Sequence, residues 1–348
     1  MHRATRIALS LVGALAVVFA AVAAALTILG NPDGGRSLRF QGFIPLPGKG
    51  VVQVLDYLTV YQGKLFVTNV STGDVFRIAL RATTLPSAAD ISVLKREPAA
   101  HGVVVDPTSG IAFVTRSGAN AVDAFEPSTM HLIRRITVAD DPDAILYDPE
   151  DRLIYVASGD SMTATLIDPV KLRVLATIPL GGSAEFAVFD SNTGLIYQNL
   201  ASINAFVAVD AATRAIAWRY SLKQCEYPTG MAIDESDRRL FIACGKSSRL
   251  VVFDLKLRRV VTSVPIGFGT DSVAYDSELH RIYTTGLLGR LSVIEQDSAD
   301  AYRVIDTIGL HFNAHTLVVD PETHRLFVGY TGFVFQPRLA VFSPIQAR

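Results

Sequence analysis

The sequence predicts an all-β chain folded as a seven-bladed β-propeller, preceded by one N-terminal transmembrane or signal helix. Three observations carry this prediction. A strand–turn–strand pattern recurs about every 42 to 44 residues, two further strand-like segments follow most copies, and seven copies can be counted. Four short strands in a period slightly above 40 residues are typical of a propeller blade rather than of a helical solenoid. The predicted domains are a leader and linker over residues 1–36 and a propeller over residues 37–348.

Each copy of the repeat consists of an apolar strand, an Asp-led turn and a second apolar strand. Alternating strands joined by such turns are typical of hairpins, because Asp bonds its own backbone at the start of a turn. We therefore assign the turn aspartates a structural role. Six copies are GVVVDPTSGIAFVTR (102–116), AILYDPEDRLIYVAS (144–158), FAVFDSNTGLIYQNL (186–200), GMAIDESDRRLFIAC (230–244), SVAYDSELHRIYTTG (272–286) and TLVVDPETHRLFVGY (316–330); the shorter seventh is YLTVYQGKLFVTN (57–69).

The last copy ends after its third strand, RLAVFSPI, near the C-terminus. The segment SLRFQGFIPLPG (37–48) has the composition of a fourth strand such as RVLATIPLGG. Pairing the two ends of the chain would close the ring and remove an exposed sheet edge. We therefore expect residues near Phe40 to Ile44 to complete the last blade.

The second strands of several copies resemble the YVTN-repeat β-propellers of bacteria. Residues 66–69, 113–116 and 155–158 read FVTN, FVTR and YVAS, each after an Asp-led turn or its counterpart. The resemblance covers residues 37–348 and implies a lactonase-like seven-bladed propeller, a group similar to lactonases and to the propeller domain of nitrous-oxide reductase. It implies little about function, since most members of the group have no assigned activity.

The first 36 residues indicate export. Arg3 and Arg6 precede an apolar run from Ile7 to Leu29, which is long enough to cross a bilayer as a helix. An uncleaved signal-anchor with the propeller on the periplasmic or extracellular side is the first interpretation. A cleaved signal, with Ala21-Val22-Ala23 as the small-residue site, is the alternative and would leave a secreted protein. In either case Cys225 and Cys244, the only two cysteines, are expected to form a disulfide.

The composition excludes several classes of function. The formal charge of -1 gives no reason to expect nucleic-acid binding, and we expect a monomer. No Gly-x-Ser-x-Gly, Ser-x-x-Lys or Gly-rich phosphate loop occurs, so local motifs give no support for a nucleophilic serine or for nucleotide chemistry. A single tryptophan argues against the Trp-marked blades of quinoprotein dehydrogenases, and no Cys-x-x-Cys-His motif is present for covalent haem.

One column of the aligned repeats is rich in acids and histidine at the start of the innermost strand. Six of its seven members are Asp, Glu or His, although the chain has only 33 acidic residues and seven histidines among 348. Because the first strands of a propeller line its channel, these side chains are expected to form a ring at the channel mouth. The column contains Asp56, His101, Asp143, Glu185, Thr229, Asp271 and His315.

A ring of crowded carboxylates favours a bound cation, since like charges otherwise repel and raise pKa values. Imidazole and carboxylate ligands suit a divalent ion such as zinc, iron, manganese or calcium. The predicted first shell is His101, His315 and one or two of the four acids, Asp56, Asp143, Glu185 and Asp271. A solvated channel mouth without a function is the competing interpretation.

Two functions follow from this ring. The first is a metal-dependent hydrolase or lyase, lactonase-like, in which Glu185 or Asp271 moves a proton and Arg116 at the rim holds an anionic group of a small-molecule substrate. The second is a non-catalytic envelope scaffold that binds a protein, a glycan or a small ligand. A haem-carrying or electron-transfer propeller is a third possibility that rests on the two histidines alone.

Overall fold

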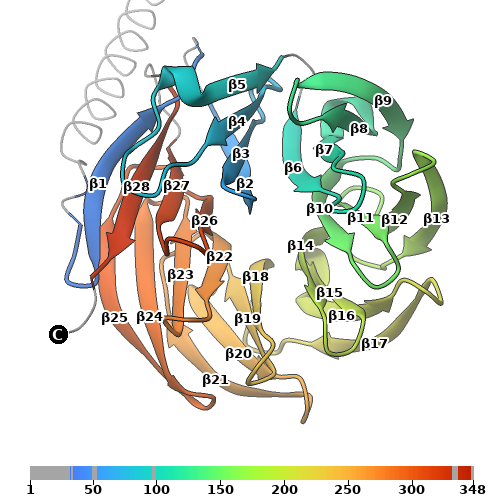
Figure 1. Cartoon of the computed structure of the whole chain (residues 1–348). Helices are drawn as coiled ribbons and strands as arrows, with labels where there is room; N and C mark the ends of the chain where they lie inside the picture. Colours follow the sequence, from blue (N-terminus) through green and yellow to red (C-terminus); the bar gives the residue numbers. More distant parts are fainter. Residues whose placement is uncertain (1–31, 33, 49–52, 96–98, 331–335, 346–348) are drawn as a thin grey trace, which may run out of the picture.

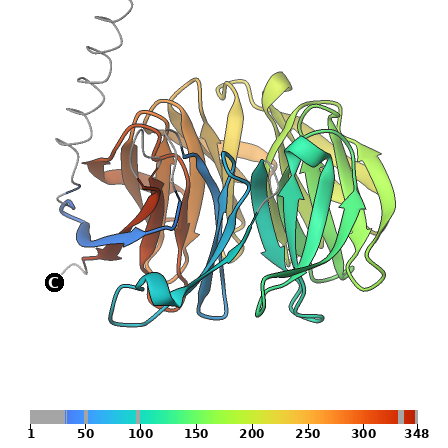
Figure 2. The ribbon, with the colours of Figure 1, turned by 90° about the horizontal axis from the view of Figure 1, so that it is seen from above.

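The computed structural model describes residues 32, 34–48, 53–95, 99–330 and 336–345. Within them, 28 strands form seven four-stranded antiparallel sheets around a central axis, which confirms the all-β class and the seven blades (Figure 1). Seen from the side, the ring is a disc with loops on its two faces (Figure 2). The predicted N-terminal helix falls outside the described residues, and no helix within them has the length and apolarity needed to span a bilayer.

The blades follow one another along the chain, and the order of strands in each runs from the axis outward. Blade one is β2 (Leu55–Tyr61), β3 (Lys64–Asn69), β4 (Val75–Ala79) and β5 (Ile91–Leu94); blade two is β6 (Ala100–Val105), β7 (Ala112–Arg116), β8 (Ala121–Glu126) and β9 (His131–Thr137); blade three is β10 (Pro142–Asp148), β11 (Leu153–Ser158), β12 (Thr163–Asp168) and β13 (Arg173–Pro179).

The remaining blades repeat this arrangement. Blade four is β14 (Ala184–Asp190), β15 (Leu195–Leu200), β16 (Ala205–Asp210) and β17 (Ala215–Ser221); blade five is β18 (Pro228–Asp234), β19 (Arg239–Cys244), β20 (Arg249–Asp254) and β21 (Arg259–Pro265); blade six is β22 (Thr270–Asp276), β23 (Arg281–Gly286), β24 (Arg290–Ser298) and β25 (Ala301–Gly309); blade seven is β26 (Leu317–Val319), β27 (Leu326–Tyr330), β28 (Arg338–Pro344) and β1 (Leu38–Pro45).

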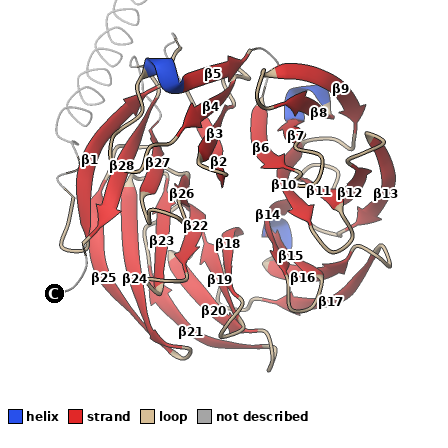
Figure 3. Cartoon of the chain, viewed as in Figure 1, coloured by secondary structure: helices blue, strands red, loops and turns tan. Residues whose placement is uncertain are grey.

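Helix is confined to three short turns in the described residues, shown in blue in Figure 3. They are η1 (Ala88–Asp90), η2 (Ser117–Ala119) and η3 (Ala201–Ile203).

The last blade is completed by the first strand of the chain, as the sequence predicts. Strand β1 pairs antiparallel with β28, from Leu38 opposite Pro344 to Pro45 opposite Arg338. A bulge between Phe40 and Gly42 interrupts the register. Because the outer edge of β28 is thereby paired, both ends of the described chain are fixed in one sheet.

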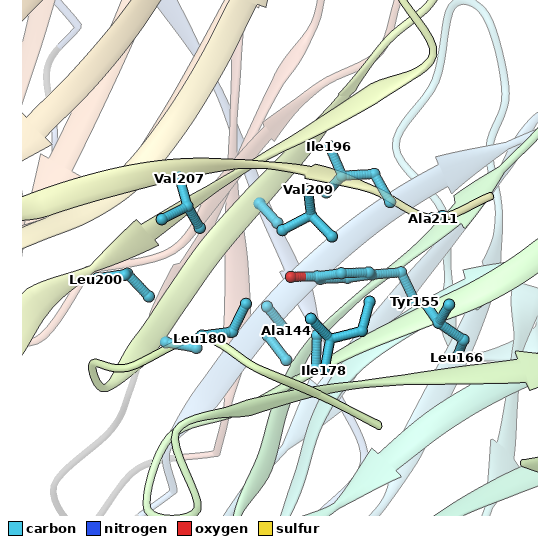
Figure 4. Close-up of a cluster of buried hydrophobic side chains, with 14 of the residues drawn as sticks. Ala144, Tyr155, Leu166, Ile178, Leu180, Ile196, Leu200, Val207, Val209 and Ala211 are labelled. Carbon is cyan, nitrogen blue, oxygen red and sulfur yellow. The ribbon is translucent and has the colours of Figure 1, made fainter. Parts of the chain in front are cut away.

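Large apolar side chains fill the wedges between neighbouring blades. Between blades three and four, Tyr155 is fully buried among aliphatic side chains such as Leu166, Ile178 and Val209 (Figure 4). Its hydroxyl donates to Oε1 of Gln198 at 3.2 Å, so the polar end of the ring is satisfied inside the core. Figure 4 labels the residues around it, including Ala144, Leu180, Ile196, Leu200, Val207 and Ala211.

The turn aspartates have the structural role predicted for them. Asp148 is typical, since its Oδ1 accepts hydrogen bonds from the backbone N–H groups of Glu150 and Asp151 at 2.9 and 3.1 Å. Two of these aspartates also contact a basic side chain of the next blade. Arg238 donates to Asp190, and His324 lies 2.9 Å from Asp276. The remaining members are Asp106, Asp234 and Asp320, each of which accepts a backbone N–H in its turn.

Candidate functional site

The acid-rich column forms a ring at one end of the channel, with one residue from each blade. Six of the seven members lie near the start of the innermost strand, and His315 lies just before β26. Blades two and seven flank blade one, so the two histidines stand on either side of Asp56. The full set is Asp56, His101, Asp143, Glu185, Thr229, Asp271 and His315.

A β-bulge presents the ring residue in each of the first six blades. In blade two, Ala100 pairs with Arg116 and the next registered pair begins at Val103, so that His101 and Gly102 lie between pairs. The same irregularity occurs around Asp56, Asp143, Glu185, Thr229 and Asp271. Because bulges bend a strand and redirect a side chain, they explain why these polar residues face the axis instead of the core.

Three ring residues from blades one to three form a compact group. Nδ1 of His101 lies 2.6 Å from Oδ2 of Asp56 and 3.3 Å from Oδ1 of Asp143. Each of the three residues offers one ligand atom within 4.8 Å of the others, which makes this the one group in the described residues whose spacing suits a metal ion. Asp143 Oδ1 is shielded from solvent and accepts no well-aligned hydrogen bond from the described residues.

The other nitrogen of His101 binds a residue that lies outside the predicted ring. Nε2 is 2.9 Å from the hydroxyl oxygen of Ser117, the first residue of η2. The hydroxyl is 16 residues from His101 in sequence, and Asp56 is 45 residues from it. Local motifs could not reveal this contact, because the three residues come from separate segments of two blades.

The electrostatics of this group favour a protonated imidazole. Burial alone would lower the pKa of His101, but the hydrogen bond to Asp56 and the charge of Asp143 raise it to about 9. Burial and repulsion from Asp56 raise the pKa of Asp143 to about 7, although His101 opposes this shift. At neutral pH the group therefore holds protons in the place that a cation would take.

The ring also borders a small cavity of about 20 Å³, which is room for about one water molecule. Burial and repulsion from Asp143 and Asp271 raise the pKa of Glu185 well above its ordinary range. Burial also raises the pKa of Asp271 to about 6, with His315 opposing the shift. The cavity is lined by Asp56, Tyr57, Glu185, Phe186, Thr229, Asp271, Ser272, His315 and Thr316.

His315 is buried and is oriented by the backbone. Its Nδ1 lies 3.0 Å from the carbonyl oxygen of Asn313, which accepts a hydrogen bond and so places the proton on Nδ1. The neutral ring then has Nε2 as its acceptor nitrogen. The structure does not bring His315 into the same ligand group as His101, so the predicted shell containing both histidines is not formed.

Tyr57 is a further channel residue that the column does not include. Its ring stacks on Phe186, with centroids 5.3 Å apart, and its hydroxyl donates to Oδ2 of Asp143 at 3.4 Å. Tyr57 directly follows Asp56, so the bulge of blade one presents two consecutive side chains to the channel. The tyrosine thereby connects the carboxylates of blades one and three with the apolar wall of blade four.

Arg116 does not occupy the position expected for a substrate-binding residue. Its side chain is 1% exposed, and it binds Oδ2 of Asp123 at 3.1 Å and the carbonyl oxygen of Gly73 at 2.5 Å. The expectation of a guanidinium open to the rim is therefore wrong, since Arg116 joins blades one and two inside the protein. Asn69, Ser158 and Tyr330, the last residues of β3, β11 and β27, are also buried.

The two cysteines form the predicted disulfide. Cys225 and Cys244 are bonded, with Cα atoms 5.0 Å apart and a separation of 19 positions in sequence. No free cysteine remains for metal binding or redox chemistry. The bond fixes the segment that leads into Thr229 against the end of β19.

No family model matches the sequence, and no curated protein matches it. Solved structures with a similar fold include virginiamycin B lyase from Staphylococcus aureus, with 12% identity and a TM-score of 0.71 over 88% of this chain and 100% of that one. A streptogramin B lyase gives 11% identity and a TM-score of 0.70 over 89% and 98%. Hydrazine synthase from Kuenenia stuttgartiensis gives 12% and 0.69 over 83% and 95%. The chain is thus similar in fold to propellers that include two lyases.

Proposed function

We propose that the channel mouth is the active centre of a hydrolase or lyase, lactonase-like, that acts on a small molecule. The observation that carries this proposal is the convergence of four carboxyl groups from separate blades, three of which have pKa values raised toward or above neutrality. Such groups can hold and release protons at neutral pH, which is the requirement for general acid–base catalysis. The two lyases of similar structure share the fold with this chain, but a shared fold does not identify the reaction.

Glu185 and Asp271 are the proposed proton carriers. Both line the cavity, but their environments differ. Asp271, with a pKa of about 6, is mostly ionised at pH 7 and can accept a proton. Burial and the charges of Asp143 and Asp271 raise the pKa of Glu185 well above its ordinary range, which favours the protonated form that can donate a proton. Two carboxyl groups in different environments can divide the roles of base and acid.

A divalent cation fits the group formed by Asp56, His101 and Asp143. Nδ1 and two carboxylate oxygens within 4.8 Å of one another suit zinc, iron or manganese, and calcium with added water ligands. The ion would displace the proton on Nδ1, leaving Nε2–H to donate to Ser117. It would supply a Lewis acid that polarises a substrate carbonyl. Because bound protons compete with the ion, its affinity should rise with pH.

The rim of the mouth favours a substrate with an apolar portion. Phe268 and Phe312, which are 53% and 62% exposed, each stand three residues before a ring residue, Asp271 or His315. Leu287 bonds to the loops of both phenylalanines, since its N–H donates to Gly269 and its carbonyl accepts from Asn313. An alkyl or aryl group could lie on this surface while a reactive carbonyl enters the cavity.

The disulfide favours a location outside the cytoplasm, because such bonds persist in oxidising compartments. We propose export on this basis together with the apolar leader, and the mode of membrane attachment stays a prediction.

A panel of aliphatic and aromatic lactones and esters tests the proposal. The purified protein should hydrolyse or open at least one of them, with EDTA and with added zinc, calcium or manganese as parallel conditions. Thermal shifts in the same buffers report cation binding separately from turnover. A protein that turns over nothing and shows no cation response would support the scaffold that binds an envelope protein or glycan instead.

A further inference from the structure

Ser117, His101 and Asp56 form a continuous chain of contacts at the edge of the ring. The Ser117 hydroxyl oxygen is 2.9 Å from His101 Nε2, and His101 Nδ1 is 2.6 Å from Asp56 Oδ2. An ionised carboxylate can only accept a hydrogen bond, so the contact with Asp56 keeps a proton on Nδ1 of His101. Nε2 donates to the serine oxygen while His101 is protonated, the form favoured at neutral pH, and accepts from the serine hydroxyl once His101 has lost that proton. A serine, a base and a carboxylate that orients the base are the parts needed to activate a serine nucleophile.

We propose that Ser117 is the nucleophile of an acyl-transfer reaction on esters or lactones, with His101 as its base and Asp56 as the group that orients the base. This inference rests on the proposed hydrolase function and gives it a route without a cation, since an ion bound at Nδ1 would leave Nε2 protonated and unable to act as the base.

The fold does not require a hydroxyl at position 117. In six blades, the residue that follows the last paired residue of the second strand donates a backbone hydrogen bond. The acceptor is the carbonyl oxygen of the residue two positions before the ring residue. In blade two this bond joins Ser117 to Ala99 at 3.1 Å. The equivalent residues of blades one and three to six are Val70, Gly159, Ala201, Gly245 and Leu287.

Two consequences follow from this comparison. Blade two is the one blade of these six that places a hydroxyl beside the histidine of the ring. Ala201 occupies the same position in blade four, so alanine is compatible with this backbone geometry. Substituting Ser117 should therefore remove the nucleophile without disturbing the blade.

Ser117 is also accessible to a substrate. Its side chain is partly exposed, and the next residue, Gly118, is exposed and has no side chain to block an approach. Asp143 adds a second carboxylate 3.3 Å from Nδ1, which would stabilise the imidazolium formed during attack. Ser117, like His101 and Asp56, is half-buried and is not sealed from solvent.

The proposed reaction has two balanced steps. In the first, the Ser117 oxygen bonds to the substrate carbonyl carbon while its proton passes to His101 Nε2. The bond from that carbon to the leaving oxygen then breaks, and His101 returns the proton to the leaving alcohol. In the second, His101 takes a proton from water, the water oxygen attacks the acyl-serine, and the proton goes back to Ser117 as the acid is released.

A serine-reactive fluorophosphonate and the hydrolysis panel together test this assignment. The probe should label one residue, identified as Ser117 by peptide mapping, and Ser117→Ala should lose labelling and at least ~1,000-fold in kcat/KM. Asp56→Asn should lose at least ~100-fold while remaining folded. Ser161→Ala is the matched control, because Ser161 lies in the corresponding loop of blade three but bonds only to Asp140 and Thr163 among the described residues.

The assays are repeated with EDTA and with added zinc to separate the two mechanisms. Hydrolysis that needs zinc and is unchanged in Ser117→Ala would overturn the nucleophile and leave the proposed function in place. Labelling at Ser161, or at no serine, would also overturn it. Labelling of Ser117 without turnover of any lactone or ester would support the nucleophile and refute the proposed substrates.

Discussion

The raised pKa values of the ring predict that the protein loses stability as the pH rises from 5 to 9. His101 has an unfolded value near 6.5 and a folded pKa of about 9, so its contribution is full below pH 6.5 and lost by pH 9. Asp143 has an ordinary value of 3.8 and a folded pKa of about 7, so ionising it costs free energy as the pH rises to 7. Both shifts mean that the folded protein binds more protons than the unfolded chain in this range.

The size of the effect follows from these shifts. One pKa unit corresponds to about 1.4 kcal/mol, so His101 accounts for about 3 kcal/mol between pH 6.5 and 9. Asp143 accounts for about 3 kcal/mol between pH 5 and 7. The two groups contact each other and share Asp56, so the losses do not add fully. We expect a total loss of about 4 kcal/mol in the free energy of unfolding.

Urea denaturation at pH 5, 7 and 9, with EDTA and at constant ionic strength, measures this loss. His101→Gln should flatten the part of the curve between pH 6.5 and 9. Asp190→Asn is the control variant: Asp190 is paired with Arg238 at the end of β14 away from Glu185, and the contacts that lower its pKa act below pH 4. It should change stability by the same amount at all three pH values. A parent whose stability is constant or rises between pH 5 and 9 would refute the electrostatic description of the ring.

Three further perturbations test other parts of the account. Replacing Cys225 and Cys244 by alanine opens a closed loop of about 20 residues and should lower the free energy of unfolding by about 3 kcal/mol; an unchanged urea midpoint would contradict the disulfide's role. Tyr155→Phe removes the hydrogen bond to Gln198 and should cost about 1 kcal/mol, whereas a stabilised variant would show that the buried hydroxyl is poorly satisfied. Phe312→Ser should raise KM for long-chain lactones or esters with little change for short-chain ones, and an equal effect on both would argue against apolar contact at the rim.

The repeat made much of the fold predictable from sequence. Its period gave seven blades, the shortened last copy pointed to residues 37–48 as the missing strand, and Asp148 and its equivalents were assigned to turns. These features are local, or they repeat with a fixed spacing, so one sequence is enough to reveal them. The ring column was predictable for the same reason, because every blade presents its member in the same part of the first strand.

The chemistry of individual ring members depends on contacts that no repeat specifies. Arg116 was expected at the rim, but Asp123 on the neighbouring strand holds it inside the protein. His101 and His315 share a column, yet one binds two carboxylates and the other a backbone carbonyl. The contact between Ser117 and His101 could not be predicted from the sequence. It spans a bulge and a short 3₁₀ turn, where tertiary structure sets the direction of each side chain.

The assignment of the channel mouth as an active centre with two proton-carrying acids is tested most directly by two variants, Glu185→Gln and Asp271→Asn. Turnover of the best lactone or ester is measured for each variant alone and for the two combined. Each variant keeps the volume of the side chain and removes its ability to exchange a proton. We expect kcat/KM to fall at least ~100-fold for each variant, with native circular dichroism. Turnover equal to that of the parent in the combined variant would contradict the assignment of Glu185 and Asp271 as the proton carriers of the channel mouth.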